Sequence, residues 1–160
     1  MRLLLTLLLT LNLLQAKDFD TSTPKKLAEF VLWTFKENKK EIFINSVIAD
    51  RATLINFVKN NLPLKKQNKA LAEMYKKEEL LKAKVIKSWE NIYHYGRLTL
   101  DINWKKITNI TVSKTRRSDI YINFNYSWKK YQIKLDDTIN MNGQLYLFDD
   151  MEWKGEIKAK

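Results

Sequence analysis

The stretch that decides the fold is Asp119–Trp153, DIYINFNYSWKKYQIKLDDTINMNGQLYLFDDMEW. Apolar and polar residues alternate along it from Ile120 to Trp128, and the alternation resumes from Tyr131 to Leu135. This period of two is typical of strands that have one buried and one wetter face. The stretch therefore predicts three consecutive antiparallel strands, forming a sheet whose apolar face needs a cover.

The first reversal is predicted at Lys129-Lys130 as a two-residue turn. That turn sets Trp128 opposite Tyr131 and places Ile120 opposite Ile139, with all of these side chains on one face. The alternation therefore predicts one long second strand that runs on past Leu135.

The second reversal is predicted at Asn142-Gly143. This pair tolerates the positive φ angles of a type I′ turn better than any other, and it lies between two extended runs. The turn places Tyr146 and Phe148 beside Ile139 and Asp137.

Helical patterns precede the strands. Thr23 and Pro24 are typical of a helix start, and Asp50 is placed to cap a second, shorter helix that ends before Pro63. The longest helical pattern runs over residues 66–95 without an internal proline or glycine. Its apolar stripe is wide enough to lie across a sheet.

A further strand is predicted between the long helix and the meander. Gly96 is placed to end the helix. Alternation then predicts a strand with a break near Lys105-Lys106. Its apolar members are Leu98, Leu100, Ile102, Trp104, Ile107, Ile110 and Val112. The end of the chain from Lys154 is expected to be a frayed tail.

Helices first and an antiparallel meander afterwards predict an α+β fold, with N-terminal helices packed on one face of a curved antiparallel sheet. The chain has 160 residues, of which 45% are hydrophobic. This length and composition suit one domain with a sizeable core, which we expect over residues 17–160.

The first 16 residues resemble a secretory signal peptide. Met1-Arg2 supplies a basic start, Leu3–Leu14 an apolar run too short to span a membrane well, and Ala16 a small residue before a polar stretch. An amphiphilic or anchoring first helix is the alternative. The chain has no cysteine, so a bacterial secreted or periplasmic protein is expected rather than a small disulfide-stapled animal domain.

The net charge of +11 comes mainly from 24 lysines, against 5 arginines. Lysine and arginine outnumber aspartate and glutamate by 17 to 10 over residues 17–97. A lysine-rich surface favours solubility in the simplest interpretation, and attraction to an anionic polymer or lipid surface is the alternative. Nucleic acid is not an expected partner, because an exported protein meets little of it.

The inventory of reactive residues is small. A single histidine and no cysteine exclude thiol catalysis and the usual zinc sites. No serine lies in a Gly-x-Ser-x-Gly elbow, and three glycines cannot build a phosphate-binding loop. The acidic run Asp149, Asp150 and Glu152 lacks calcium-loop spacing and is expected to be a solvated turn. We therefore expect no cofactor and no metal.

Asp137 is the one candidate for catalysis that the register suggests. It falls on the apolar face beside Ile139 and Phe148, where burial would raise its pKa and suit a general base. Alternatively, a bulge at Asp136-Asp137 leaves both carboxylates in solvent.

The order of elements and the ending NGQLYL at Asn142–Leu147 resemble the secreted bacterial members of the nuclear-transport-factor-2-like (cystatin-like) superfamily. The resemblance implies a cone-shaped roll with a pocket between helices and sheet, used for catalysis in some members and for binding or assembly in others. In the isomerases and dehydratases of the group an aspartate works with tyrosine or histidine partners, which points to Asp137 with His94, Tyr95, Tyr126 or Tyr146. Members often pair through the sheet, so a homodimer is one option.

Aromatic side chains on the strands are candidates for a ligand surface, because they supply large contact area with a polar handle. The candidates are Tyr126, Trp128, Tyr131 and Tyr146. The leading expectation is an exported, non-enzymatic domain that binds a small apolar molecule, an envelope component or a partner protein. The alternatives are an isomerase- or dehydratase-like enzyme, or attachment to an anionic surface through lysines.

Overall fold

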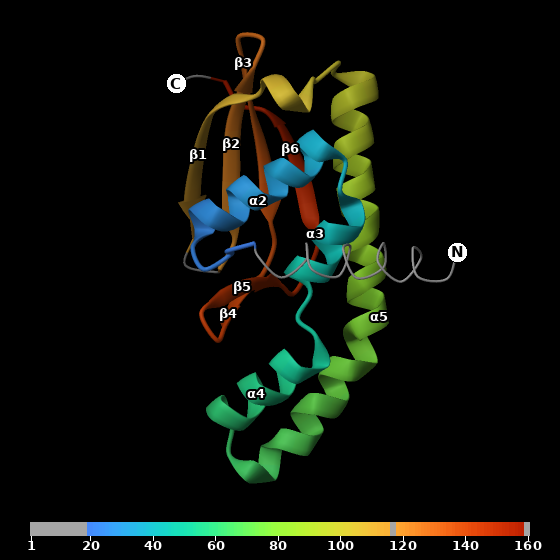
Figure 1. The fold of residues 1–160 in the computed structure, drawn as a ribbon, viewed down its shortest axis with the longest axis vertical. Helices are drawn as coiled ribbons and strands as arrows, with labels where there is room; N and C mark the ends of the chain where they lie inside the picture. Colours follow the sequence, from blue (N-terminus) through green and yellow to red (C-terminus); the bar gives the residue numbers. More distant parts are fainter. Residues whose placement is uncertain (1–18, 116–117, 159–160) are drawn as a thin grey trace, which may run out of the picture.

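The computed structural model describes residues 19–115 and 118–158. Figure 1 shows helices packed against a four-stranded antiparallel sheet, with a separate two-stranded hairpin at one end of that sheet. The predicted α+β fold is therefore confirmed. The predicted signal peptide, residues 1–16, lies outside the described residues. No helix in the described ranges is both long enough and apolar enough to cross a membrane.

The first two helices begin and end where local chemistry dictates. Helix α2 (Pro24–Glu37) starts as predicted, because the Thr23 hydroxyl accepts a hydrogen bond from the N–H of Lys26 at 3.2 Å. It stops at Asn38, whose left-handed backbone (φ 51°) terminates the helix. A short helix, α3 (Lys40–Val47), follows.

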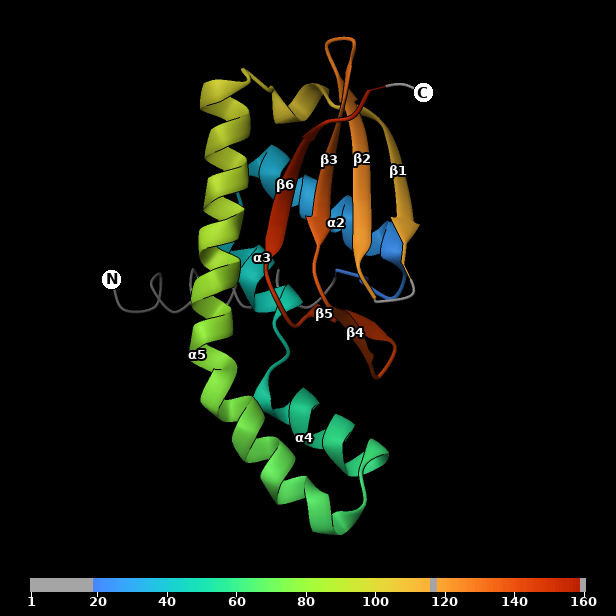
Figure 2. The same cartoon turned by 180° about the vertical axis from the view of Figure 1, so that it is seen from behind.

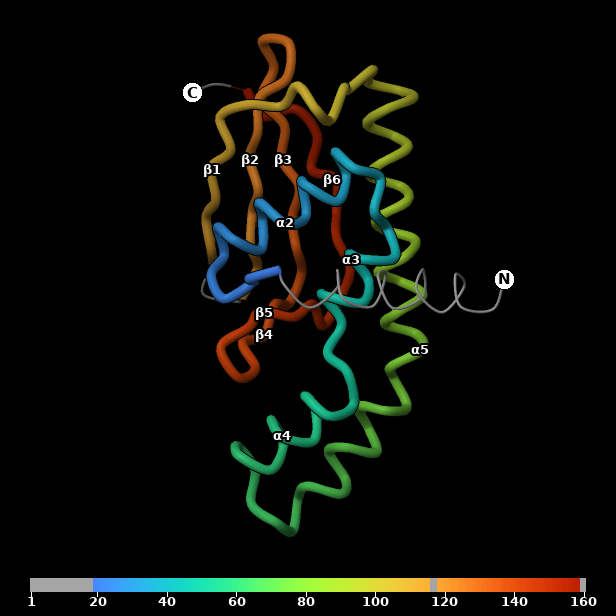
Figure 3. Tube along the Cα trace, in the orientation of Figure 1, coloured from blue at the N-terminus to red at the C-terminus, as the bar shows by residue number. Residues whose placement is uncertain are grey.

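The next two helices form a hairpin. Helix α4 (Arg51–Asn61) is capped as predicted by Asp50, whose carboxylate accepts from the N–H of Thr53 at 2.7 Å. Pro63 separates α4 from α5 (Leu64–His94), the 31-residue helix that the sequence predicts almost to its ends. Figure 3 shows that α4 and the first half of α5 extend beyond the sheet, and we call α4 together with residues 64–78 the arm.

The main sheet has the strand order β1 (Thr108–Lys114), β2 (Ile120–Tyr126), β3 (Lys129–Leu135) and β6 (Met151–Glu156). The predicted turn at Lys129-Lys130 is wrong, because the chain reverses at Ser127-Trp128. Ile120 consequently pairs with Leu135 rather than with Ile139. The pairing is displaced by an even number of residues, so the side chains within β2 and β3 keep their predicted faces.

The continuous strand predicted past Leu135 is also wrong. The positive φ of Asp137 (44°) breaks it, and the chain then forms the separate hairpin of β4 (Thr138–Met141) and β5 (Gln144–Leu147). The turn at Asn142-Gly143 is confirmed, with φ angles of 53° and 84°. Strand β6 pairs with β3, so the frayed tail predicted from Lys154 is wrong over the end of β6.

The strand predicted between Leu98 and Trp104 is replaced by a π-helical turn, η1 (Tyr95–Thr99), and a short 3₁₀ helix, η2 (Trp104–Lys106). Gly96 is buried, and a Cβ there would lie 2.4 Å from the Trp104 ring. The indole therefore packs directly on the backbone of the helix end, and its ring also lies 5.7 Å from that of Phe124 in the sheet. Only from Thr108 onward does the predicted strand form.

The core lies between the apolar face of the sheet and helices α2, α3 and α5. Seen from behind, α2 crosses the sheet and α5 runs beside β6 (Figure 2). The fully buried Trp89 of α5 donates from Nε1 to the Thr34 hydroxyl of α2 at 3.1 Å, which joins these two helices. The N-terminal segment is tied to the β4–β5 hairpin, because Thr21 donates to the side chain of Gln144 at 2.8 Å.

Candidate ligand-binding pocket

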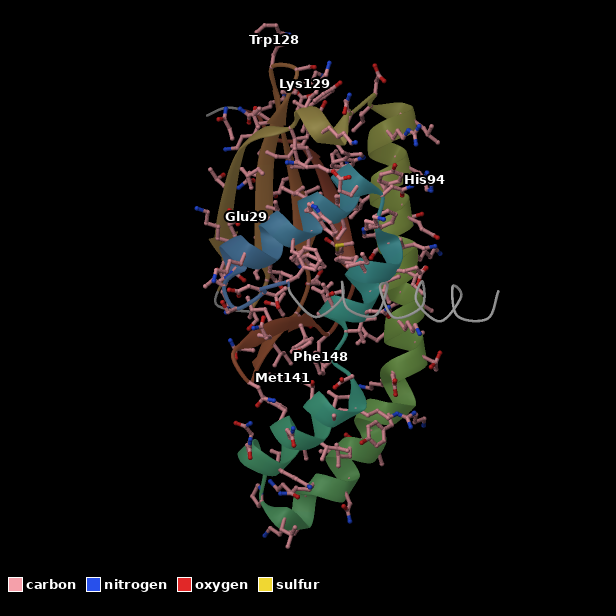
Figure 4. All side chains as sticks on the ribbon, viewed as in Figure 1. Glu29, His94, Trp128, Lys129, Met141 and Phe148 are labelled. Carbon is pink, nitrogen blue, oxygen red and sulfur yellow. The ribbon has the colours of Figure 1, made fainter. Side chains whose placement is uncertain are left out.

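A second apolar cluster lies outside the main core, where the arm meets the β4–β5 hairpin. Its buried members come from the segment before α4, from α4 itself and from β4: Ala49, Leu54 and Met141. Partly buried side chains surround them: Phe57, Leu71, Met74, Tyr75, Ile139, Tyr146 and Phe148. Figure 4 labels Met141 and Phe148 at the end of the sheet that faces the arm. The cluster therefore joins the arm to the rest of the molecule.

An apolar pocket of about 290 Å³ opens beside this cluster. Its walls come from the α3–α4 connection, α4, α5 and the end of β5. The apolar lining residues are Ile48, Ala49, Leu54, Ala70, Met74, Leu81, Leu147 and Phe148. The charged lining residues are Glu73, Lys77 and Glu78. Apolar walls with a few polar groups are the usual composition of a site for small molecules, and this volume is at the small end of the range of such sites.

Contacts between the two helices hold the arm side of the pocket in place. Arg51 at the start of α4 reaches α5, where its Nε lies 3.2 Å from Glu78 Oε2. The same guanidinium stands 5.1 Å from the centre of the Tyr75 ring, a cation–π distance. The carboxylate of Glu78 lines the pocket and is paired with Arg51.

A larger groove of about 1160 Å³ runs between the C-terminal half of α5 and β6. It is more open than the apolar pocket and is lined by charged side chains that include Lys84, Lys87 and Glu152. Lys84 Nζ lies 2.8 Å from Asp149 Oδ1 and links α5 to the segment before β6. An open, charged groove of this kind buries less of a small ligand than the apolar pocket does, so the pocket is the better candidate site.

The structure does not bring the four predicted ligand-binding aromatics together. Tyr131 is buried in the main core beside Trp153, with the ring centres 5.5 Å apart. Tyr126 is half-buried at the end of β2, and Trp128 is fully exposed at the tip of the β2–β3 hairpin. Only Tyr146 belongs to the second apolar cluster.

The two weak catalytic candidates also lie apart from the pocket. Asp137 is exposed rather than buried on the apolar face, because its positive φ ends β3 and turns the chain away from the main sheet. The alternative, a bulge that leaves both carboxylates in solvent, is right about the exposure of Asp137 only, because Asp136 is half-buried and β3 ends at Leu135. His94 is exposed at the end of α5, where Figure 4 labels it, and it lines the charged groove. Neither residue lines the apolar pocket.

Near this break the buried Asp119 and the half-buried Asp136 form a charge cluster with Lys134. Lys134 Nζ lies 2.6 Å from Asp136 Oδ1 and 3.5 Å from Asp119 Oδ2. The hydrogen bond to Asp136 raises the pKa of Lys134 well above its ordinary value. Burial raises the pKa of Asp136 despite Lys134. Burial also acts to raise the pKa of Asp119, but the N–H of Asp137 and the charge of Lys134 lower it overall. One lysine thus balances only one of the two carboxylates, and the nearby charge of Asp119 also acts to raise the pKa of Asp136.

Sequence reasoning missed the pocket because its lining residues look like ordinary core positions. Ala70, Met74 and Leu81 fall on one face of the long helix at helical spacing. The length of the long helix was the one signal in the sequence that could have indicated the pocket. A 31-residue helix is about 46 Å long, whereas a seven-residue strand is about 23 Å long, so the helix extends past the sheet. An apolar stripe that continues past the sheet needs another partner.

A scan against protein-family models gave no match, and searches of curated proteins and of solved structures gave none either. The resemblance to the nuclear-transport-factor-2-like superfamily therefore stays a prediction. The candidate site rests on the geometry of this chain alone.

Proposed function

We propose that this chain is an exported, non-enzymatic binding protein for a small apolar molecule, which it holds in the pocket between the arm and the β4–β5 hairpin. The observation that carries the proposal is the pocket itself, which has apolar walls supplied by four separate parts of the chain. The export part rests on the signal-like pattern of residues 1–16.

The walls favour an aliphatic or aromatic ligand without a buried charge. Leu54, Met74 and Phe148 offer no hydrogen bond to a polar group, and burying an unpaired polar group is costly. The charged residues Glu73 and Lys77 are exposed, so a polar end of the ligand would lie beside them in solvent. Met74 suits such a site because its unbranched side chain adapts to different shapes.

The size of the pocket sets the affinity that we expect. An alkyl chain of about eight carbons gains about 6 kcal/mol on burial at ~0.8 kcal/mol per methylene. Association costs several kcal/mol, which reduces this gain. Since about 6 kcal/mol alone corresponds to a dissociation constant of roughly 40 micromolar, the constant for a ligand held by apolar contact alone should be roughly millimolar or weaker.

N-phenylnaphthylamine, a neutral probe whose fluorescence rises in apolar surroundings, tests the proposal. We expect saturable binding to the chain and competition by a medium-chain fatty acid. Ala70 lines the pocket and is half-buried, so Ala70→Phe should fill part of the space. This change should weaken binding at least about tenfold, equivalent to ~1.4 kcal/mol.

Ala72 provides the matched control. It lies on the same helix, is exposed and does not line the pocket. Ala72→Phe adds the same side chain and should leave the dissociation constant within about twofold, since that difference is less than ~0.5 kcal/mol. Equal binding by the two variants, or a probe signal that does not saturate, would contradict the proposal. The comparison also removes any contribution from the apolar run Leu3–Leu14.

The isomerase or dehydratase alternative gains no support from the geometry. It requires Asp137 in a pocket with His94 or a tyrosine, and Asp137 is exposed at the β3–β4 break.

A further inference from the structure

The outer end of the arm is strongly basic. Residues 59–69, KNNLPLKKQNK, join α4 to α5 and contain four lysines and no acidic residue. We call them the basic tip. Figure 1 shows this tip at the far end of the molecule from the β2–β3 hairpin. Its lysines, all exposed, are Lys59, Lys65, Lys66 and Lys69.

These four lysines differ from those lysines of the main body that are ion-paired. Lys40, Lys84 and Lys134 each lie within 2.8 Å of a carboxylate oxygen. Among residues 19–115 and 118–158, none of the four tip lysines has a carboxylate within ion-pair distance. The positive field of the basic tip is therefore not neutralised by the rest of the described chain.

An apolar residue stands at the centre of this charge. Leu64 is 83% exposed, although leucine is normally buried. Gln67 Nε2 donates to the carbonyl of Leu62 at 2.9 Å, which fixes the turn that carries Leu64. A fixed turn thus presents one leucine to solvent with lysines on both sides.

Two of the tip lysines lie where a positive charge destabilises α5. Lys65 and Lys66 lie in its first turn, where the helix dipole is positive, and that turn contains no acidic residue. A local arrangement that costs stability is characteristic of a functional surface.

We propose that the basic tip docks on an anionic lipid bilayer, with the lysines at the headgroups and Leu64 inserted between them. Each lysine close to an anionic bilayer contributes roughly fivefold to binding. Single-stranded nucleic acid is the less suitable occupant, because such sites use aromatic side chains for stacking and the tip has none. This attachment is independent of the apolar pocket.

Sedimentation with vesicles tests the attachment on the full chain. The vesicles contain either equal parts of phosphatidylglycerol and phosphatidylcholine, or phosphatidylcholine alone. The readout is the ratio of the two binding constants, in which any contribution of Leu3–Leu14 to both vesicle types cancels. We expect a preference for anionic vesicles that falls steeply between about 50 and about 500 mM salt.

Charge reversal at the tip has a control at the other end of the molecule. Lys65→Glu with Lys66→Glu should reduce binding to anionic vesicles more than about 25-fold, since two attractions are lost. The same change should stabilise α5, because glutamate suits a helix start, so unfolding would not explain the loss. Lys105→Glu with Lys106→Glu alters an exposed lysine pair in η2 identically and should change binding less than about threefold.

Leu64→Ser distinguishes a bilayer from any other polyanion. Its control is Leu98→Ser, which alters another exposed leucine (77%) in η1. Leu64→Ser should weaken vesicle binding about tenfold or more, since burial of a leucine side chain is worth about 1.5 kcal/mol or more. Leu98→Ser should have no effect.

Three results would overturn the attachment: equal effects of reversal at the tip and at η2, no effect of Leu64→Ser, or tighter tip-dependent binding to a single-stranded oligonucleotide than to vesicles. Ala70→Phe should bind vesicles like the parent chain. The test of bilayer attachment through the basic tip can therefore fail without affecting the test of ligand binding in the pocket, and the reverse also holds.

Discussion

Trp128 is the residue that departs furthest from what its chemistry favours. It is fully exposed at the tip of the β2–β3 hairpin, as Figure 4 shows. Its φ is 70° and that of Ser127 is 45°, so both central residues of a two-residue turn have left-handed backbones. Asparagine and glycine are favoured at these positions, and a bulky side chain there is strained.

Replacing Ser127-Trp128 by Asn-Gly should therefore stabilise the protein. A residue with a Cβ loses about 1 to 2 kcal/mol of stability in the left-handed conformation, and asparagine and glycine avoid much of this loss. Glycine also has more conformational freedom in the unfolded chain, which reduces the stabilisation. We expect a net increase of about 1 kcal/mol in the free energy of unfolding, measured by urea titration followed by circular dichroism. A decrease would show that Trp128 makes a stabilising contact.

The same two residues explain why the predicted register was wrong. Trp128 continues the apolar alternation, so the sequence favoured placing it in the strand and the turn at Lys129-Lys130. Alternation has a period of two and cannot distinguish registers that differ by an even number of residues. The face of the sheet on which Ile120 and Ile133 lie was therefore predictable, but the residues with which they pair on the neighbouring strand were not. At Asn142-Gly143 the turn chemistry was explicit and the prediction was right.

At the scale of elements, capping residues determine where the helices lie, and Asp50 is the cap that affects the pocket. It fixes the start of α4, directly beside the lining residue Ala49. The N–H of Thr53 donates to its carboxylate and lowers the pKa of Asp50. Helix boundaries were predictable because such caps are local, whereas the π-helical turn at Tyr95–Thr99 packs against Trp104, a contact that no local pattern reports.

Removal of this cap should have a pH-dependent effect. Asp50→Ala should lower the free energy of unfolding by about 1 kcal/mol near neutral pH. Because the pKa of Asp50 is lowered from 3.8 in the folded chain, its contribution is complete above that value. The contribution is lost as the pH falls through the lowered pKa, so the parent and the variant should converge in acid. Urea titrations at a series of pH values measure this, and a constant difference down to the lowest pH would contradict it.

At the scale of the whole molecule, the arm separates two surfaces of different chemistry. Its inner side, with Leu54 and Met74, contributes to the apolar pocket, and its outer end forms the basic tip. The α+β architecture was predictable from the order of helical and alternating patterns. The arm was not, because the stripe on α5 identifies an apolar face without identifying what covers it.

The most direct measurement of the pocket uses methyl NMR with ¹³C-labelled methionine. Among the four methionines of the chain, Met74 lines the pocket and Met151 lines the groove beside β6. Titration with N-phenylnaphthylamine should shift the Met74 methyl signal through the ring current of the bound probe and leave that of Met151 in place. A shift of Met151 with Met74 unchanged, or no shift of either signal at saturation, would contradict ligand binding in the pocket between the arm and the hairpin.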